Sequence, residues 1–206
     1  MNIAIDSVSC GMIQENAYIV SASGRDDCVG VDPGDEADKL IRCIGDLRVG
    51  AILLTHGHFD HIMAVGALAE RYDAPVYVGA ADIEMLNDPS INGYAGLMGN
   101  PNQTWPRIEA VPFGDALTAC GMTFEVLPTP GHSKGSVCLY LRNEGVIFTG
   151  DTLFEAGYGR LDLHGGDVNE MVASLKRLFA LPDGVRAYPG HGGETTIGAE
   201  RARYRL

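Results

Sequence analysis

The seven residues 55–61, with the sequence THGHFDH, constrain this chain more than any other stretch. Half of its six histidines and one aspartate fall within them: His56, His58, Asp60 and His61. An apolar run at 51–54 predicts a buried strand before the motif, and apolar residues at helical spacing over 62–72 predict a helix after it. The motif thus occupies a turn at the carboxyl end of a strand, where open α/β sheets bind ligands. Imidazole and carboxylate at this density indicate a metal site, and zinc fits such ligands.

The composition predicts one globular domain over residues 1–206. Apolar residues make up 46% of the chain, yet no apolar run approaches the roughly 18 to 20 residues that a membrane span needs. The first residues lack the basic region and the apolar stretch of a secretory signal. We therefore expect a cytoplasmic protein with no membrane partner.

Charge and cysteine content exclude two further classes of protein. The net charge is −12 and the basic residues are scattered singly, which argues against a nucleic-acid partner. The five cysteines lie far apart without a CxxC pair, so neither a disulfide framework nor a thiolate zinc site is indicated. Cys10 has no base within local reach, which makes a catalytic thiol the weaker alternative to a buried, reduced one.

The order of the expected elements predicts an α/β fold with two sheets, covered by helices on both outer faces. Strand-like runs occur at 2–8, 15–21, 27–31, 51–54, 75–78, 122–126, 136–142, 145–149 and 185–188. Helices are expected after an Asp35 cap, over 62–72 and 80–87, after an Asp167–Glu170 capping box, and from Thr196. Residues 88–107 predict a long loop that is either a substrate wall or a surface excursion.

Three later turns carry metal-type residues at predicted strand ends: His132, Asp151 and His191. Together with the motif they give seven candidate ligands, which are too many for one zinc ion and suit two. We expect the ions to be held by His56, His58 and His132 and by Asp60, His61 and His191. Asp151 is expected to bridge them, because a carboxylate can span two cations. The sixth histidine, His164, is expected at the surface.

Several motifs together resemble the metallo-β-lactamase fold superfamily, in its glyoxalase II-like (hydroxyacylglutathione hydrolase) branch: ENAYIV, VDPG, LLTHGHFDH, PTPGHSKGSV, FTGDTLF, GYGR and YPGHGGETTIGAER. They cover nearly the whole chain, in a short form without the C-terminal helical domain of full-length hydroxyacylglutathione hydrolases. The resemblance implies a four-layer αββα sandwich with a dinuclear site at one edge. It carries the ligand assignment onto the same seven residues, and it implies that Asp32 supports the ligand turns without binding a metal ion itself.

The same resemblance implies a metal-dependent thioesterase. Two divalent ions, zinc or else iron or manganese, would generate hydroxide near neutral pH. Asp60 and Asp151 become the candidate catalytic residues, the first orienting the hydroxide and the second bridging the ions. A thiol of pKa about 8.5 leaves as thiolate without a general acid, and a bridging aspartate counts against β-lactam hydrolysis.

The GYGR motif offers candidate substrate-binding residues, Arg160 and Tyr158. An arginine there would bind a small anionic thioester, and the alternative is a solvated loop arginine. Glutathione itself is in doubt without the helical domain.

Three rival functions stay open at this point. The sequence GHSKG fits a serine-hydrolase elbow around Ser133, but the predicted strand after it lacks the strand–turn–helix context. A mononuclear iron persulfide dioxygenase of the same superfamily would use two histidines and an aspartate. A non-catalytic metal-binding module is the third. The acyl group, the thiol, the metal and the oligomeric state are left open by the sequence.

Overall fold

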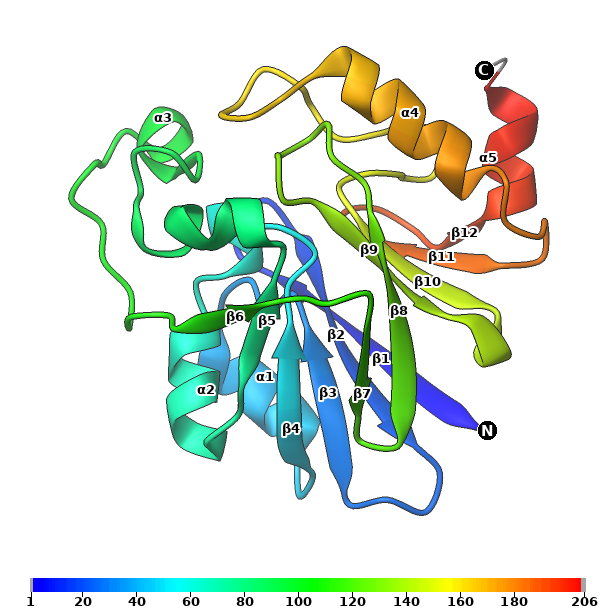
Figure 1. The fold of residues 1–206 in the computed structure, drawn as a ribbon. Helices are drawn as coiled ribbons and strands as arrows, with labels where there is room; N and C mark the ends of the chain where they lie inside the picture. The colour runs from blue at the N-terminus through cyan, green and yellow to red at the C-terminus, as the bar shows by residue number, and fades with distance from the viewer. Residues whose placement is uncertain (1, 205–206) are drawn as a thin grey trace.

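The computed structural model describes residues 2–204, which form two six-stranded sheets (Figure 1). The first sheet has the order β1-β2-β3-β4-β5-β6, with bounds Ile3–Cys10, Glu15–Ala22, Asp27–Val31, Arg48–Leu53, Val76–Val78 and Ala110–Pro112. The second has the order β12-β11-β10-β9-β8-β7; in chain order from β7 its bounds are Ala116–Ala119, Met122–Pro128, Val137–Leu141, Val146–Gly150, Arg186–Pro189 and Thr195–Thr196. Each sheet is therefore built from one contiguous half of the chain.

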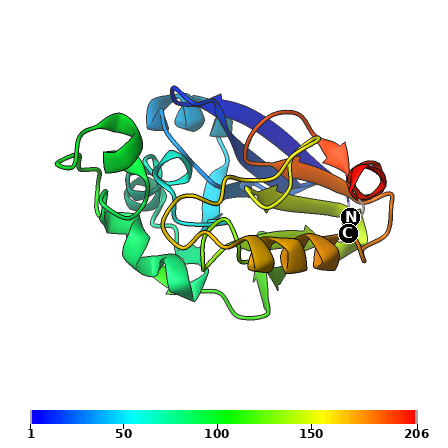
Figure 2. The same ribbon diagram turned by 90° about the horizontal axis from the view of Figure 1, so that it is seen from above.

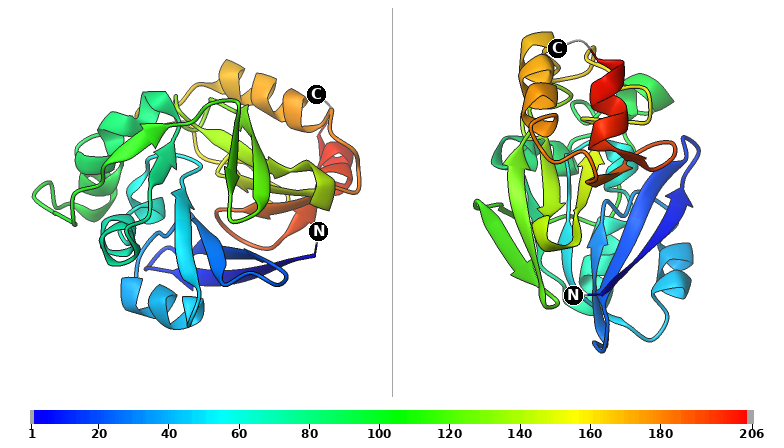
Figure 3. Two further views of the ribbon diagram at one scale, coloured as in Figure 1. Left: turned by 60° about the horizontal axis from the view of Figure 1, so that its bottom comes forward. Right: turned by 90° about the vertical axis from the view of Figure 1, so that its right-hand side faces the viewer.

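Helices cover the outer faces of both sheets, which gives four layers (Figure 3). Helices α1 (Ala37–Ile44) and α2 (Val65–Tyr72) bury Leu40 and Leu68 against the first sheet. Helices α4 (Val168–Leu178) and α5 (Ile197–Arg203) bury Leu175 and Ile197 against the second. A third cluster of apolar side chains fills the space between the sheets. The predicted αββα sandwich is confirmed.

The buried side chains follow the periodicity of each element. In β8 the apolar residues Met122, Phe124 and Val126 are buried and Thr123 is exposed, because one face of this strand meets the inner core. Strand β10 is buried along its whole length. The Asp167 side chain accepts from the amides of Asn169 and Glu170 and so caps α4 as predicted.

Two predicted caps differ in the structure. Glu170 does not complete the capping box: its carboxylate lies 3.0 Å from Lys134 Nζ instead. Asp35 does not cap α1 either. The N-cap residue is Glu36, in a left-handed conformation without a side-chain cap, and the Asp35 carboxylate accepts from the Glu36 amide. Because Glu36 is left-handed, the chain turns after Asp35, and the Asp35 side chain does not reach the first turn of the helix.

The prediction of a helix over 62–72 is wrong at its N-terminal end. Helix α2 begins at Val65, and a 3-10 turn, η1 (Phe59–His61), precedes it. The amides of Met63 and Ala64 donate to the carbonyls of Gly34 and Pro33, at 2.8 and 3.2 Å. They are thus unavailable to a helix, and they tie the histidine motif to the end of β3.

Between β5 and β6 the chain forms a projection beside the open edge of the sandwich (Figure 2). The short helix expected over 80–87 is present and is a 3-10 helix, η2 (Ala80–Asn87). The predicted loop 88–107 contains a short helix, α3 (Tyr94–Met98), which the sequence did not indicate. Trp105 anchors this segment by donating from Nε1 to the Leu86 carbonyl at 2.8 Å. No helix within residues 2–204 combines the length and the apolar character needed to cross a membrane.

Candidate metal centre

All seven predicted ligands converge at one edge of the sandwich. The histidine motif follows β4, Asp151 follows β10, His191 follows β11, and His132 lies in the turn between β8 and β9. Strand pairs β3–β4 and β10–β11 are parallel, so their carboxyl ends meet at this edge. The structure thereby brings together turns from both halves of the chain.

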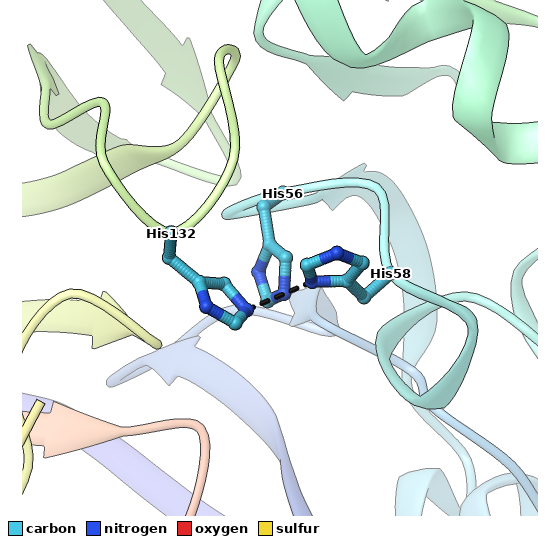
Figure 4. Close-up of side chains that lie close together, drawn as sticks. All are labelled: His56, His58 and His132. Atoms are coloured by element: carbon cyan, nitrogen blue, oxygen red, sulfur yellow. Dashed lines mark hydrogen bonds between the residues drawn. The ribbon is translucent and has the colours of Figure 1, made fainter. Parts of the chain in front are cut away.

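His56, His58 and His132 form the first group of ligands (Figure 4). His58 Nδ1 lies 2.8 Å from His132 Nε2, and one nitrogen of each ring lies within 4.8 Å of the others. All three side chains are buried, with exposed fractions of 1–2%. Their rings point toward one another from two separate loops.

Asp60, His61 and His191 form the second group. Asp60 Oδ2 lies 3.2 Å from His191 Nε2 and 3.6 Å from His61 Nε2. This group has the carboxylate that the first one lacks.

Asp151 lies between the two groups. Its Oδ1 is 3.4 Å from His61 Nε2, and its Oδ2 is 3.4 Å from His132 Nε2 and 3.7 Å from His191 Nε2. One carboxylate therefore faces histidines of both groups, which is the geometry expected of a bridging ligand.

Hydrogen bonds at Nδ1 orient three of the histidine rings. His56 Nδ1 lies 3.1 Å from Thr55 Oγ1, His61 Nδ1 lies 3.1 Å from Asp32 Oδ2, and His132 Nδ1 lies 2.7 Å from the Arg160 carbonyl. A proton held at Nδ1 leaves the lone pair of Nε2 free. Such outer partners of ligating histidines set both tautomer and ring direction.

Buried atoms without partners show that this cluster fits divalent metal ions. His56 Nε2, His61 Nε2 and Asp151 Oδ1 are buried and have no hydrogen-bond partner. Leaving such atoms unpaired is costly, and cations bound by the two groups, with Asp151 between them, would satisfy all three. Gly190 packs closely against these ligands, and its lack of a side chain leaves them room. A Cβ at this position would lie 2.4 Å from Asp151 Oδ1 and 2.5 Å from His61 Cε1.

The charges in the cluster divide the histidines into two kinds. Burial, reinforced by neighbouring imidazoles, lowers the pKa of His56 well below its usual range and that of His58 to about 3. Burial also acts against protonated His61, but the carboxylates of Asp60 and Asp151 outweigh it and raise the pKa of His61. The first group therefore offers neutral imidazoles, and the second pairs imidazole with carboxylate.

Asp32, predicted as a supporting residue, lies directly behind the ligands. Its carboxylate accepts from the Thr55 amide at 2.7 Å, from Thr55 Oγ1 at 2.6 Å and from His61 Nδ1 at 3.1 Å. Its backbone is left-handed, with φ 47°. A non-glycine residue in this conformation is strained, and such strain is concentrated at functional sites.

Two buried carboxylates of the site had not been expected. Asp82, in η2, accepts from the Gly57 amide at 3.0 Å, from Ser133 Oγ at 2.6 Å and from the Gly135 amide at 2.6 Å. Glu15 is fully buried, its Oε1 lies 3.7 Å from His61 Nδ1, and neither of its carboxylate oxygens has a hydrogen-bond partner. Glu15 belongs to the quoted ENAYIV motif, whereas nothing in the sequence marks Asp82.

A cavity of about 440 Å³ opens onto the cluster. Arg160 lines it and forms two 2.7 Å hydrogen bonds with the exposed Asp162 carboxylate. Tyr158, predicted to bind substrate together with Arg160, does not line this cavity. Its exposed ring packs instead near Tyr204, with ring centroids 6.3 Å apart.

The serine-hydrolase alternative is wrong. Ser133 is fully buried and donates to Asp82, and its turn leads into strand β9 rather than into a helix. Asp151 and His191, which would complete a triad, belong to the metal cluster.

Comparison with known families shows which protein superfamily this chain belongs to. The family model described as "Metallo-beta-lactamase superfamily" matches residues 10–191 of this chain. The chain belongs to this superfamily. Its relatives include the probable metallo-hydrolase YqgX of Bacillus subtilis, 38% identical over 93% of this chain and 91% of that protein. Another is the hydroxyacylglutathione hydrolase GloC of Haemophilus influenzae, 33% identical over 98% of this chain and 95% of that protein. This superfamily membership supports a metal-dependent hydrolase.

Solved structures of the superfamily match almost the whole chain. The BLEG-1 B3 metallo-beta-lactamase superposes with a TM-score of 0.90 at 40% identity, covering 97% of both chains. TTHA1623 in a di-iron-bound form superposes with a TM-score of 0.82 at 40% identity, covering 95% of this chain and 96% of that one. Both matches extend over nearly the full length of the two chains compared.

Proposed function

We propose that this protein is a dinuclear metal-dependent thioesterase of the glyoxalase II type. The observation that carries the proposal is the place of Asp151, whose two oxygens face histidines of both ligand groups. The name of GloC as a hydroxyacylglutathione hydrolase supports the thioester, and the di-iron form of TTHA1623 supports two ions. Zinc suits the histidine-rich ligands best, with iron or manganese as substitutes.

The two ions would be held by the two groups, with Asp151 shared between them. Bound there, they would supply Lewis acidity, which lowers the pKa of water and polarises a carbonyl group. The protein's own part is to hold the ligands in position. The Nδ1 partners Thr55, Asp32 and the Arg160 carbonyl do this by fixing the ring directions.

Asp60 is suited to orient the attacking water. It lines the cavity, and its carboxylate is at the same time within 3.2 Å of His191. Burial works against the ionised form, yet His61 and His191 keep the pKa of Asp60 below its ordinary value. Asp60 thus stays an acceptor at neutral pH and can take a hydrogen bond from water in the cavity.

A thioester suits this cavity because its leaving group needs no general acid to protonate it. A thiolate of pKa about 8.5 departs without a proton donor. The titratable side chains that line the cavity are either ligands of the cluster or, as Arg160, already paired. Arg160 is the cavity group that could receive a carboxylate of an anionic thioester.

The mononuclear iron persulfide dioxygenase is the strongest alternative. Two histidines and one aspartate would suffice for it, whereas all seven candidate ligands lie together here. A β-lactam is a second substrate to test, because the structurally similar BLEG-1 is titled a B3 metallo-beta-lactamase.

The deciding experiment measures metal content per chain on the native protein, followed by a substrate panel. We expect about two equivalents of metal and hydrolysis of a hydroxyacyl thioester that a chelator abolishes. One equivalent of iron with oxygen consumption on a persulfide would replace the proposal with the dioxygenase. Hydrolysis of a β-lactam in preference to thioesters would replace the substrate class. Bound metal without any turnover would favour a metal-binding module.

A further inference from the structure

A second cavity of about 210 Å³ adjoins the cavity over the metal cluster. Ile13, Phe59, Asp60 and Met98 line both, so the two cavities lie side by side at these four residues. Because Asp60 belongs to the ligand cluster, a molecule reacting there could extend one end into the second cavity without leaving the first.

The walls of this side cavity are mostly apolar. The tip of the β1–β2 hairpin supplies Met12 and Ile13, and α3 supplies Met98 across the opening. Met63 and Tyr94 complete the wall. Met12 has an exposed fraction of 79%, Ile13 46% and Met98 36%, so apolar surface at the rim is left in contact with water. Flexible methionine side chains suit ligands of varying shape.

Within residues 2–204, the side chains that line the side cavity include no cation that could pair with an anionic occupant. The charged side chains lining it are Asp35 and Asp60, and no lysine, arginine or histidine is among its lining residues within 2–204. Asp35 accepts from the Glu36 amide at 2.6 Å, and as a carboxylate it offers a ligand no hydrogen-bond donor. An uncharged apolar chain gains from this surface, whereas a carboxylate would find no cationic side chain to pair with among the lining residues.

We infer that the side cavity binds an unbranched, uncharged apolar chain of the substrate, attached to the reacting carbonyl group through its acyl or its thiol side. The inference rests on the proposed thioesterase function. It gives the enzyme a selectivity that increases with the length of this chain, whereas an anionic arm would be confined to the side of Arg160.

The test uses the metal-loaded protein and two series of neutral thioesters. One series lengthens the acyl group from acetyl to octanoyl on N-acetylcysteamine, and the other lengthens an alkanethiol on a constant acetyl group. Each methylene that enters the cavity should raise kcat/KM about fourfold until the space is filled. A rise in either series supports the inference and identifies the side that enters. A flat response in both series, with turnover intact, overturns it.

Two variants connect the response to this cavity. Met12→Asp places a charge at the exposed rim and should flatten the dependence on chain length. Met63→Ala enlarges the cavity and should move the optimum to longer chains. Val111→Asp is the matched control, because Val111 is also exposed, at 53%, but lines neither cavity. An equal response of the Met12 and Val111 variants would overturn the inference.

A binding measurement separates this inference from the proposed function. S-alkyl-N-acetylcysteamine thioethers cannot be hydrolysed, and their affinity can be measured by calorimetry without turnover. Tighter binding of longer chains to the wild type than to Met12→Asp supports the cavity even where no thioester is cleaved. Chain-independent binding beside active hydrolysis overturns the cavity and leaves the thioesterase standing.

Discussion

Asp82 accepts a hydrogen bond from the hydroxyl of Ser133 at 2.6 Å, across 51 positions of the sequence. Ser133 follows His132, and the same carboxylate also accepts from the amide of Gly57, which lies between two other ligands. Asp82 thereby holds the two loops of the first ligand group at a fixed spacing. It is a positioning residue that touches none of the proposed metal ions.

Asp82→Asn replaces one acceptor oxygen by a donor that faces an N–H or O–H group. We expect a loss of about 2 kcal/mol in the free energy of unfolding of the metal-free protein, because a buried donor stays unpaired. Zinc affinity should fall by about 10- to 100-fold. Urea unfolding and a chelator competition titration measure the two effects. Asp88→Asn, at an exposed carboxylate nearby, is the control; zinc affinity equal to that of the control would contradict the positioning role.

Asp151→Ala removes the carboxylate between the two groups. We expect hydrolysis to be abolished and the metal content to fall below two equivalents, because both groups lose a ligand. Elemental mass spectrometry and a thioester assay measure this. The control is His164→Ala, which removes the exposed histidine outside the cluster and should keep full metal content. Full activity of the Asp151 variant would rule out bridging.

Gly190→Ala tests how tightly the cluster is packed. The added Cβ would approach Asp151 Oδ1 and His61 Cε1 to about 2.5 Å or less, so these ligands must move. We expect reduced metal retention in a protein that keeps its secondary structure by circular dichroism. Gly114→Ala, where an added Cβ meets nothing within 4 Å, should retain metal normally. Equal retention in the two variants would show that the cluster yields easily.

Asp162 controls the charge that Arg160 presents to the cavity. The hydrogen-bonded guanidinium of Arg160 lowers the pKa of Asp162 to about 2. A lowered pKa keeps the pair intact above the usual carboxyl range and releases it only as the pH falls toward 2. We therefore expect the selectivity between anionic and neutral thioesters to stay constant from pH 5 to 8.

Asp162→Asn should free the arginine and raise kcat/KM for carboxylate-bearing thioesters severalfold relative to neutral ones. The ratio of the two kcat/KM values, measured across that pH range, checks both statements. An unchanged ratio in the variant would place Arg160 outside substrate binding.

The ligand cluster could be anticipated from the sequence because its members stand in local motifs at strand ends. His132 lies between Gly131 and Ser133, and Asp151 directly follows a buried strand, so each turn is recognisable without knowledge of the others. Two sheets covered by helices on both outer faces follow from the order of the expected elements. The hydrogen bonds that connect these motifs cannot be read from any local sequence pattern. Ser133 and Gly135, which donate to Asp82, are brought to it only by the fold.

The errors in the predicted elements have the same origin. Strands β6 and β7 have three and four residues, and pairing with β5 and β8 defines them rather than their own composition. Helix α2 starts late because the two amides before it, those of residues 63 and 64, donate to the carbonyls of Gly34 and Pro33. Tertiary hydrogen bonds thus override the helical spacing of 62–64.

Each sheet comes from one half of the chain, and the ligands are divided in the same way. Four of them precede β6 and three follow β7. A cut between Phe113 and Asp115 would therefore leave two fragments, each with a complete sheet and neither with a complete ligand group. Reassembly of such fragments should be strengthened by metal, which would add bonds across the interface that the apolar cluster between the sheets already forms.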